Sequence, residues 1–271
     1  MEHDLLRPPL DAAVLRDGLV GPGLGWRRLD VVEQTGSTNA DLLARAATGE
    51  DIDGCVLLAE YQNAGRGRHG RRWSAPPRAQ IAMSVGVNGA SVARSAWGWL
   101  PLATGVAVVD ALAAAAGVSA GLKWPNDVLV NDGKLAGILT EVAAPAPVIV
   151  IGLGLNVTLT AEEAPDPAAT SLLMLGSSMT DRNALVHRIL RELIARIEAW
   201  RTAAGADPGL VADYQRHSVT LGRCVQATLP GDREVVGVAQ GVDEMGRLQV
   251  DTGAQTVSIS AGDITHLRAA R

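Results

Sequence analysis

Apolar and polar positions divide this chain into short apolar runs and one long amphipathic stretch. From Thr180 to Ala204, apolar side chains recur at three- and four-residue spacing, with arginines between them, which predicts a helix. Short apolar runs bounded by glycine, proline or polar residues predict strands instead. We expect strands over Cys55 to Glu60, Gln80 to Val87, Asp127 to Asn131, Lys134 to Val142 and Val148 to Val157.

Three other segments have helical patterns. Thr38-Asn39-Ala40-Asp41 has the form of a capping box and predicts a helix that runs toward Ala47. The stretch around Trp99 to Ala116 is nearly uncharged, but it carries Pro101 and Asp110, so we expect a buried helix rather than a membrane span. A short closing helix is expected over Asp207 to His217.

The texture changes after Leu221, where short β-type runs alternate with turn sequences such as Pro230-Gly231-Asp232. They predict a small all-β barrel of about fifty residues, a size that is marginal alone and should pack on the larger domain. We therefore divide the chain into residues 1–220 and 221–271. The first 34 residues are expected to be a short lead-in, and 161–169 an exposed loop.

Composition narrows the class of protein. The chain has no Phe and two Tyr among 47% hydrophobic residues, so its core must be aliphatic and tryptophan-based. A net charge of −5 disfavours general nucleic-acid binding. Two cysteines make no disulfide framework, and no signal peptide is visible at the N-terminus, so we expect a reduced cytoplasmic protein with neither nucleic acid nor membrane as partner.

Lysine occurs at two positions only, Lys123 and Lys134, while the other 22 of the 24 basic residues are arginine. Lysine is a compact point charge, whereas arginine is a planar fork, so a site that retains lysine needs the point charge. Both lysines lie in the densest motif, Lys-Trp-Pro-Asn-Asp followed by Gly-Lys-Leu-Ala-Gly. Chance retention in an arginine-biased chain is the alternative.

A loop rich in glycine and arginine, Gly65 to Trp73, is the second strong signal. Its four arginines create a positive field inside an acidic protein and suit a phosphate or an adenylate, and Trp73 offers a ring face to a purine. We expect the loop to order only when a ligand neutralises its charge. A solvated basic loop is the alternative, and the Gly-Lys-Ser/Thr ending of a Walker A loop is missing.

Weaker signals come from glycines and short polar groups. Gly152-Leu153-Gly154-Leu155-Asn156 follows an apolar strand and fits a pocket floor better than a dinucleotide fingerprint, since no helix follows. Ser37-Thr38-Asn39 lies at a helix N-terminus, where it either caps the helix or binds a polar ligand. Asp127 either holds Mg²⁺ or orients an amine, and the alternative is that it belongs to a Pro-Asn-Asp turn. No His/Cys spacing matches a zinc site, so we expect no metal centre built from these residues.

Taken in order, these segments closely resemble the biotin protein ligases. The matching stretches are Thr35 to Asn39, Gln62 to Trp73, Lys123 to Asp127, Gly133 to Glu141 and Gly152 to Val157. The resemblance implies an α+β fold similar to class II aminoacyl-tRNA synthetases, with a mixed sheet and helices, followed by an SH3-like β-barrel.

The resemblance also implies an ATP-dependent ligase that uses Mg²⁺. Biotin is activated as biotinyl-5′-AMP and is then transferred to one lysine of a biotin carboxyl carrier domain, in acetyl-CoA, acyl-CoA or pyruvate carboxylase. The implied catalytic residues are Lys134, Arg66, Arg68 and Asp127. The implied biotin-binding residues are Ser37, Thr38, Asn39, Gln62, Gly65, Arg66, Lys134, Gly137, Gly152 and Gly154. The implied ATP and adenylate contacts are Arg66, Arg68, Arg71, Trp73, Lys123, Asn126, Lys134 and Asn156.

Three rival interpretations remain open. A lipoate or octanoate ligase shares the fold and the adenylation, a non-catalytic biotin sensor or repressor shares the ligand, and a carrier-binding scaffold would have lost activity. Only 34 residues precede Thr35, so we expect no operator-binding domain. His69 departs from the arginine common at its place in the family. A weak or ligand-dependent homodimer is left open.

Overall fold

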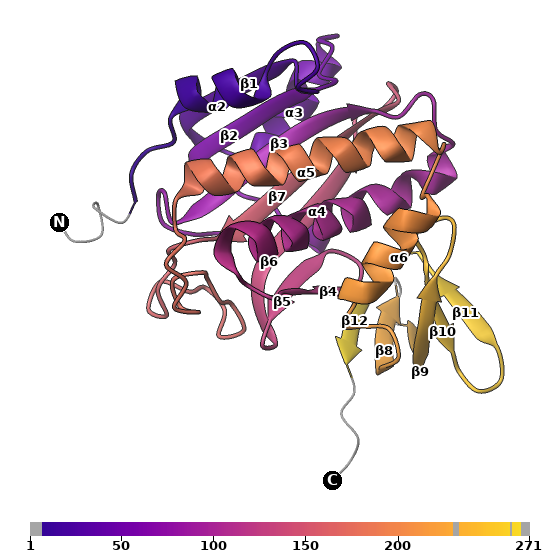
Figure 1. The fold of residues 1–271 in the computed structure, drawn as a ribbon. Helices are drawn as coiled ribbons and strands as arrows, with labels where there is room; N and C mark the ends of the chain where they lie inside the picture. The colour runs from indigo at the N-terminus through magenta and orange to yellow at the C-terminus, as the bar shows by residue number, and fades with distance from the viewer. Residues whose placement is uncertain (1–6, 230–232, 261, 267–271) are drawn as a thin grey trace.

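The computed structural model describes residues 7–229, 233–260 and 262–266. Its larger sheet has seven strands in the order β1-β2-β3-β7-β6-β5-β4 (Figure 1). The outermost strand β1 runs parallel to β2, and every other neighbouring pair is antiparallel, so the sheet is mixed as predicted. The strands are β1 (Arg28–Thr35), β2 (Cys55–Gln62), β3 (Gln80–Asn88), β4 (Gly121–Lys123), β5 (Asp127–Val130), β6 (Gly133–Val142) and β7 (Val148–Asn156).

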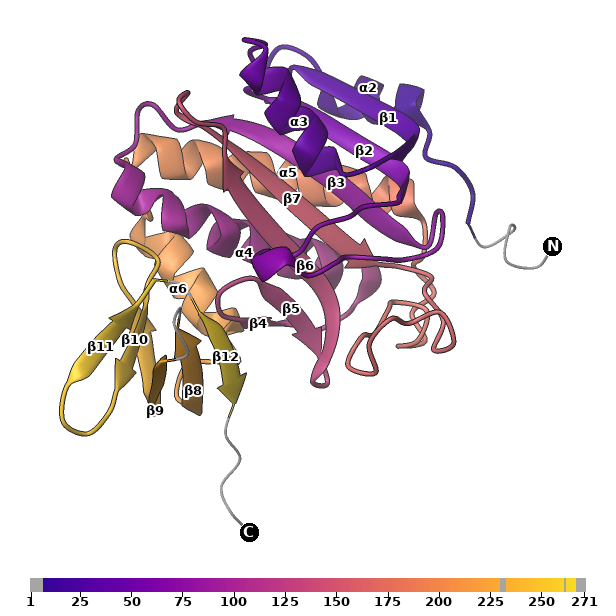
Figure 2. The same ribbon diagram turned by 180° about the vertical axis from the view of Figure 1, so that it is seen from behind.

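Helices cover both faces of this sheet. α4 (Trp99–Ala116) and α5 (Arg182–Thr202) lie side by side across one face (Figure 1), and α3 (Thr38–Ala47) lies on the other (Figure 2). α2 (Ala12–Leu19) packs beside β1 and α5, and α6 (Pro208–His217) packs on α4 and β4. Two short 3₁₀ turns complete the set, η1 (Arg68–Gly70) and η2 (Arg94–Gly98).

α4 is the buried helix that the sequence predicts. By length and composition, the 23-residue stretch Arg94–Ala116 could cross a membrane. Most of α4 is nevertheless buried between the sheet and α5, and Leu100, Ala103 and Val106 are fully inaccessible. A helix surrounded by protein needs no polar face, so its composition follows from its place in the core.

Tryptophan and aliphatic side chains fill the core, as expected without phenylalanine. Trp26, Trp99 and Trp200 are among the largest fully buried side chains. Each indole N–H donates to a backbone carbonyl, that of Leu190, Asp243 and Ala96 respectively. These hydrogen bonds matter because a buried polar N–H without a partner would offset part of the gain from burying the ring.

The C-terminal strands form a separate antiparallel sheet in the order β11-β10-β9-β8-β12. It packs on the larger unit through the turn between β9 and β10, where the indoles of Trp99 and Trp124 donate to the carbonyls of Asp243 and Gly246. The expected packing of this unit on the larger domain is therefore present. The strands are β8 (Cys224–Leu229), β9 (Arg233–Val242), β10 (Leu248–Asp251), β11 (Thr256–Ile259) and β12 (Asp263–His266).

Several local predictions were wrong. The supposed lead-in contains α2 and β1, and the short strands β4 and β12 were not predicted. The cap of α3 is Ser37 rather than Thr38, because the Ser37 hydroxyl accepts the N–H of Ala40.

The segment 161–169 is a loop, as expected, and it is mostly exposed. Both cysteines are free.

Candidate active site

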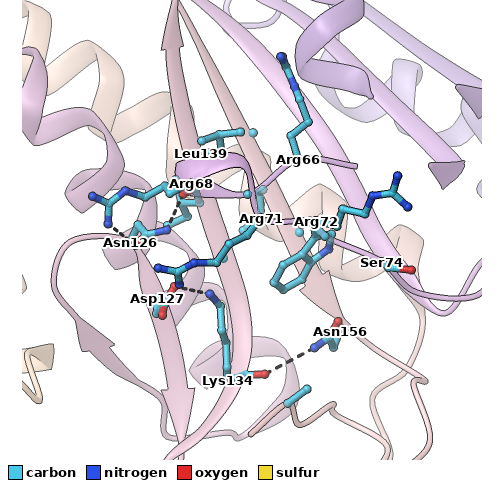
Figure 3. Close-up of a pocket in the computed structure, with 18 of the residues that line it drawn as sticks. Arg66, Arg68, Arg71, Arg72, Ser74, Asn126, Asp127, Lys134, Leu139 and Asn156 are labelled. Atoms are coloured by element: carbon cyan, nitrogen blue, oxygen red, sulfur yellow. Dashed lines mark hydrogen bonds and ion pairs between the residues drawn. The ribbon is translucent and has the colours of Figure 1, made fainter. Parts of the chain in front are cut away.

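A pocket of about 450 Å³ opens where β6 and β7 meet the glycine and arginine loop. Figure 3 shows its basic and polar side chains, which come from segments far apart in the sequence. Every residue that the sequence assigned to biotin, ATP or catalysis lines this pocket except Gly65.

Glycines let two side chains lie directly on the strands that form the floor. A Cβ at Gly154 would lie 2.3 Å from the indole nitrogen of Trp73, and one at Gly137 would lie 3.1 Å from the same ring. A Cβ at Gly152 would lie 2.2 Å from Oδ1 of Asn39. The glycine pattern therefore makes a pocket floor, as one reading of the sequence proposed, since only glycine permits such close approach.

One end of the pocket is a buried polar network. Oε1 of Gln62 accepts the backbone N–H of Thr38 at 2.8 Å, and the Thr38 hydroxyl lies 3.1 Å away from it. The Ser84 hydroxyl lies 2.7 Å from that of Thr38 and donates to Oδ1 of Asn39 at 2.5 Å. Because its Oε1 is already engaged, Gln62 can offer its amide N–H groups to a ligand.

Lys134 lies beside this floor and is paired with a carboxylate. Its Nζ is 2.6 Å from Oδ1 of Asp127 and 5.7 Å from the centroid of the Trp73 ring. Its backbone is fixed by the loop after β7, because Lys134 N donates to Ala168 O at 2.6 Å and Thr170 N donates to Lys134 O at 3.0 Å. The ammonium therefore has a defined position with both a carboxylate and an aromatic face nearby.

Asn156 also contacts the loop after β7. Its side-chain amide donates to the carbonyl of Thr170 at 2.9 Å and lies 3.5 Å from the carbonyl of Lys134. In this structure Asn156 therefore stabilises the wall of the pocket, whereas the sequence suggested a nucleotide contact.

The glycine and arginine loop forms a tight hairpin, with a bridge between Arg66 and Arg72 and the N–H of Gly67 donating to the carbonyl of Arg71 at 2.7 Å. Arg68 donates to Oδ1 of Asn126 at 3.2 Å and to the carbonyl of Gly262 at 3.3 Å. Burial lowers the pKa of the Arg68 guanidinium, and the nearby Asp127 carboxylate opposes that shift. The expected disorder of this loop in a ligand-free crystal stays a prediction.

Arg66 lies apart from the other basic groups. In Figure 3 it points away from Arg68, Arg71 and Lys134. Its guanidinium is 2.9 Å from Oε2 of Glu141 on β6. Recruiting Arg66 to an anion beside Lys134 therefore requires this ion pair to exchange.

Sequence reasoning missed several residues of the site. Ser84, which contacts Thr38 and Asn39, lies in a mostly apolar strand without any motif. Ile264 and Thr265 line the pocket from β12. Glu141 did carry a signal, since it is the one charged residue between Leu135 and Val157. A lone carboxylate in an apolar strand needs a partner, and Arg66 supplies it.

Two family models match the chain. Residues 31–156 match the biotin/lipoate A/B protein ligase family, and residues 220–267 match the biotin protein ligase C-terminal domain. A biotin protein ligase from Aquifex aeolicus, solved in complex with biotin and ATP, has the same fold, with a TM-score of 0.76 at 24% identity over 90% of this chain and 100% of that chain. The fold and the site thus define a ligase of the biotin/lipoate class.

Sequence relatives of known name show which ligases within this class the chain resembles. The chain is 59% identical to the biotin–[acetyl-CoA-carboxylase] ligase of Mycobacterium tuberculosis over 98% of this chain and 99% of the relative. It is 33% identical to the bifunctional ligase/repressor BirA of Escherichia coli over 79% of this chain and 66% of the relative. The chain belongs to the biotin protein ligases, which confirms the family, the enzyme class and the fold that the sequence predicted.

Proposed function

We propose that this pocket activates biotin with ATP and passes it to a lysine of a biotin carboxyl carrier domain. In the first step a biotin carboxylate oxygen attacks the α-phosphorus of ATP, biotinyl-5′-AMP forms, and pyrophosphate leaves. In the second step the lysine amine attacks the acyl carbon, an amide forms, and AMP leaves while the amine loses a proton. The observation that carries the proposal is the position of Lys134, on the glycine floor and close to the arginine loop.

The polar end of the pocket is proposed to hold the ureido ring of biotin. Gln62, Thr38 and Asn39 already form an ordered network there, with Ser37 and Gly152 alongside. Such a network recognises a ligand that has both donors and acceptors, because a ligand lacking them would leave buried polar groups unpaired. Lipoate and octanoate carry no ureido group, so this end of the pocket favours biotin.

The basic end is proposed to bind ATP and the adenylate. Lys134 would stabilise the negative charge shared by the carboxylate and the α-phosphate in both steps, with Arg66, Arg68, Arg71 and Lys123 around the phosphates. Trp73 lies over Gly137 and Gly154 beside Lys134, and this supports a role for its ring beside the reacting carboxylate. An adenine contact at Trp73, Asn126 or Asn156 stays a proposal.

Asp127 is proposed to act twice. In this structure it is paired with Lys134, at 2.6 Å. When the ammonium turns to the adenylate, the freed carboxylate can orient the incoming lysine amine and accept its proton.

Mg²⁺ is proposed to enter with ATP. Among the residues that the structure describes, no group of three or more His, Cys, Asp or Glu side chains lies together as a metal site. Mg²⁺ commonly uses one or two carboxylates and substrate phosphates rather than a cage of protein ligands. Asp127 and Asp166 both line the pocket; we propose Asp127 as the carboxylate that would contribute, and the ion would neutralise phosphate charge.

Further proposals concern partners and location. We propose the carrier domain of acetyl-CoA carboxylase as the acceptor, with acyl-CoA or pyruvate carboxylase as further candidates, and the cytoplasm as the location. The absence of operator binding and the weak or ligand-dependent homodimer stay predictions.

Pyrophosphate–ATP exchange by the purified protein tests the first step, with biotin, lipoate and octanoate supplied separately. We expect exchange with biotin alone, and we expect Lys134→Ala to reduce its rate by about 10²- to 10³-fold, the range for loss of one electrostatic contact to a transition state. Unchanged melting would show that the variant folds. Exchange with lipoate or octanoate would move the protein to the sister ligases, and biotin binding without exchange would favour a sensor.

A further inference from the structure

Glu141 contacts two residues of the pocket, Arg66 and Asn39, through a single oxygen. Its Oε2 is 2.9 Å from the guanidinium of Arg66 and also accepts from Nδ2 of Asn39 at 2.9 Å. The two partners have opposite environments, because Asn39 is buried whereas the Arg66 side chain is 41% exposed. Moving the Arg66 side chain therefore costs little free energy, whereas moving that of Asn39 costs more.

Asn39 is fixed at every polar atom. Its Oδ1 accepts from Ser84 at 2.5 Å, and its Nδ2 donates to Leu139 O at 3.1 Å as well as to Glu141. From Ser84 the contacts continue to Thr38 and Gln62. A continuous set of polar contacts thus runs from Arg66 of the loop to Gln62 at the polar end of the pocket.

We propose that Glu141 is a positioning residue that holds Asn39 permanently and releases Arg66 when an anion binds in the pocket. This inference rests on the proposed function. In this structure Arg66 is paired with Glu141, and its side chain points away from Lys134 (Figure 3). When the phosphates of ATP or the adenylate arrive, Arg66 exchanges one anionic partner for another, and Asn39 keeps its acceptor. Glu141 therefore competes with the nucleotide for Arg66 and supports biotin through Asn39.

Two substitutions at Glu141 separate these roles. In Glu141→Gln the side chain keeps an acceptor oxygen for Asn39 but loses the charge that attracts Arg66. We expect the KM for ATP in biotin-dependent exchange to fall about two- to fivefold, the range for a partly exposed ion pair, with the Kd of biotin unchanged within twofold. In Glu141→Ala the acceptor is lost too, so the Kd of biotin should also rise at least fivefold.

A double-mutant cycle with Arg66→Gln tests whether the effect on ATP passes through Arg66. We expect Glu141→Gln to leave the KM for ATP unchanged when Arg66 is already glutamine. Glu33→Gln is the matched control, because Glu33 pairs with Arg78 at 3.3 Å on an exposed surface, and it should change neither constant.

Biotin titration by calorimetry and exchange kinetics supply the two readouts. A KM for ATP that stays constant or rises in Glu141→Gln would overturn the inference, as would an effect that persists in the Arg66→Gln background. Failure of the wild-type protein to exchange with biotin would instead count against the proposed function, so the two failures are distinguishable.

Discussion

Gly154 shows how one missing methyl group shapes the site. Trp73 lies directly on this glycine, and its indole N–H donates to Oε1 of Gln80 at 2.5 Å. The ring is thus held both by packing on Gly154 and by a hydrogen bond from its edge. Because a Cβ at Gly154 would lie 2.3 Å from the indole nitrogen, any other residue must displace the ring.

Gly154→Ala is therefore expected to raise the KM for biotin about tenfold, since displacement of Trp73 deforms the floor beside Lys134, and such overpacking costs about 1–3 kcal/mol. Exchange kinetics at saturating ATP measure the change. Gly241→Ala in β9 is the control, because its Cβ would meet no atom within 4 Å. Equal KM values in the two variants would show that Trp73 has no such role.

Residues with distinctive chemistry were predictable, and residues with ordinary chemistry were not. The two lysines, the arginine loop and the paired glycines are unusual in the sequence, and the fold brings them into one pocket. Ser84 has an ordinary hydroxyl in an apolar strand, and only its place opposite α3 brings it to Asn39. The partner of Lys134 was also missed, because local sequence does not reveal which of several roles Asp127 takes.

At the scale of elements, the N-terminal segment 7–10 is fastened to the sheet by buried charges. Arg182 and Glu60 pair at 2.6 Å, each with 3% of its side chain exposed. Arg182 donates to the carbonyl of Pro8 at 2.6 Å, and Glu60 accepts the N–H of Leu10 at 2.5 Å. The two charges thus pair with each other and with the backbone of the segment, although Nε of Arg182 is buried without a hydrogen-bond partner.

Glu60→Gln is expected to destabilise the fold by about 3–5 kcal/mol, because it leaves the Arg182 charge buried without a counter-charge. Urea unfolding measures the change. Asp51→Asn is the matched control, since its pair with Arg27 is exposed, and its cost should stay below about 1 kcal/mol. Adding Arg182→Met to Glu60→Gln should recover part of the loss, and similar costs for the two single variants would contradict this account.

The prediction of elements failed at strands that lie at a sheet edge or are very short. Central strands such as β3 and β7 are mostly apolar and almost entirely buried, and they were predicted within a residue or two. β1 is an edge strand with charged and polar positions, and its parallel pairing with β2 joins Arg28 to Cys55. β4 has only three residues, too few for a pattern, and β12 has four. These strands depend on distant partners for their stability.

At the scale of the whole molecule, the small C-terminal sheet completes the site. Ile264 and Thr265 of β12 line the pocket, and the carbonyl of Gly262 accepts from Arg68. His266 on the same strand lies 3.1 Å from the hydroxyl of Thr220, which in turn accepts the N–H of Trp124. The sheet is therefore joined to the Lys-Trp-Pro-Asn-Asp segment through a histidine.

This junction predicts a dependence of stability on pH. Burial lowers the pKa of His266 below its usual 6.5, and the positive charges of Lys123 and Arg223 lower it further, against Asp132, which raises it. The unfolded chain therefore binds the proton more readily, so stability falls as the pH falls through 6.5 toward the folded pKa and levels off below it.

We expect the free energy of unfolding to drop more between pH 7.5 and pH 5.5 in the wild type than in His266→Gln, which keeps a hydrogen-bonding group for Thr220 but cannot titrate. Because His266 is only partly buried, its contribution should stay well below about 1.4 kcal/mol per pH unit, the limit for one proton. Urea unfolding at both pH values measures the difference. Identical pH dependence in the two proteins would mean that protonation of His266 does not affect the junction, and a steeper dependence in His266→Gln would reverse the assigned sign.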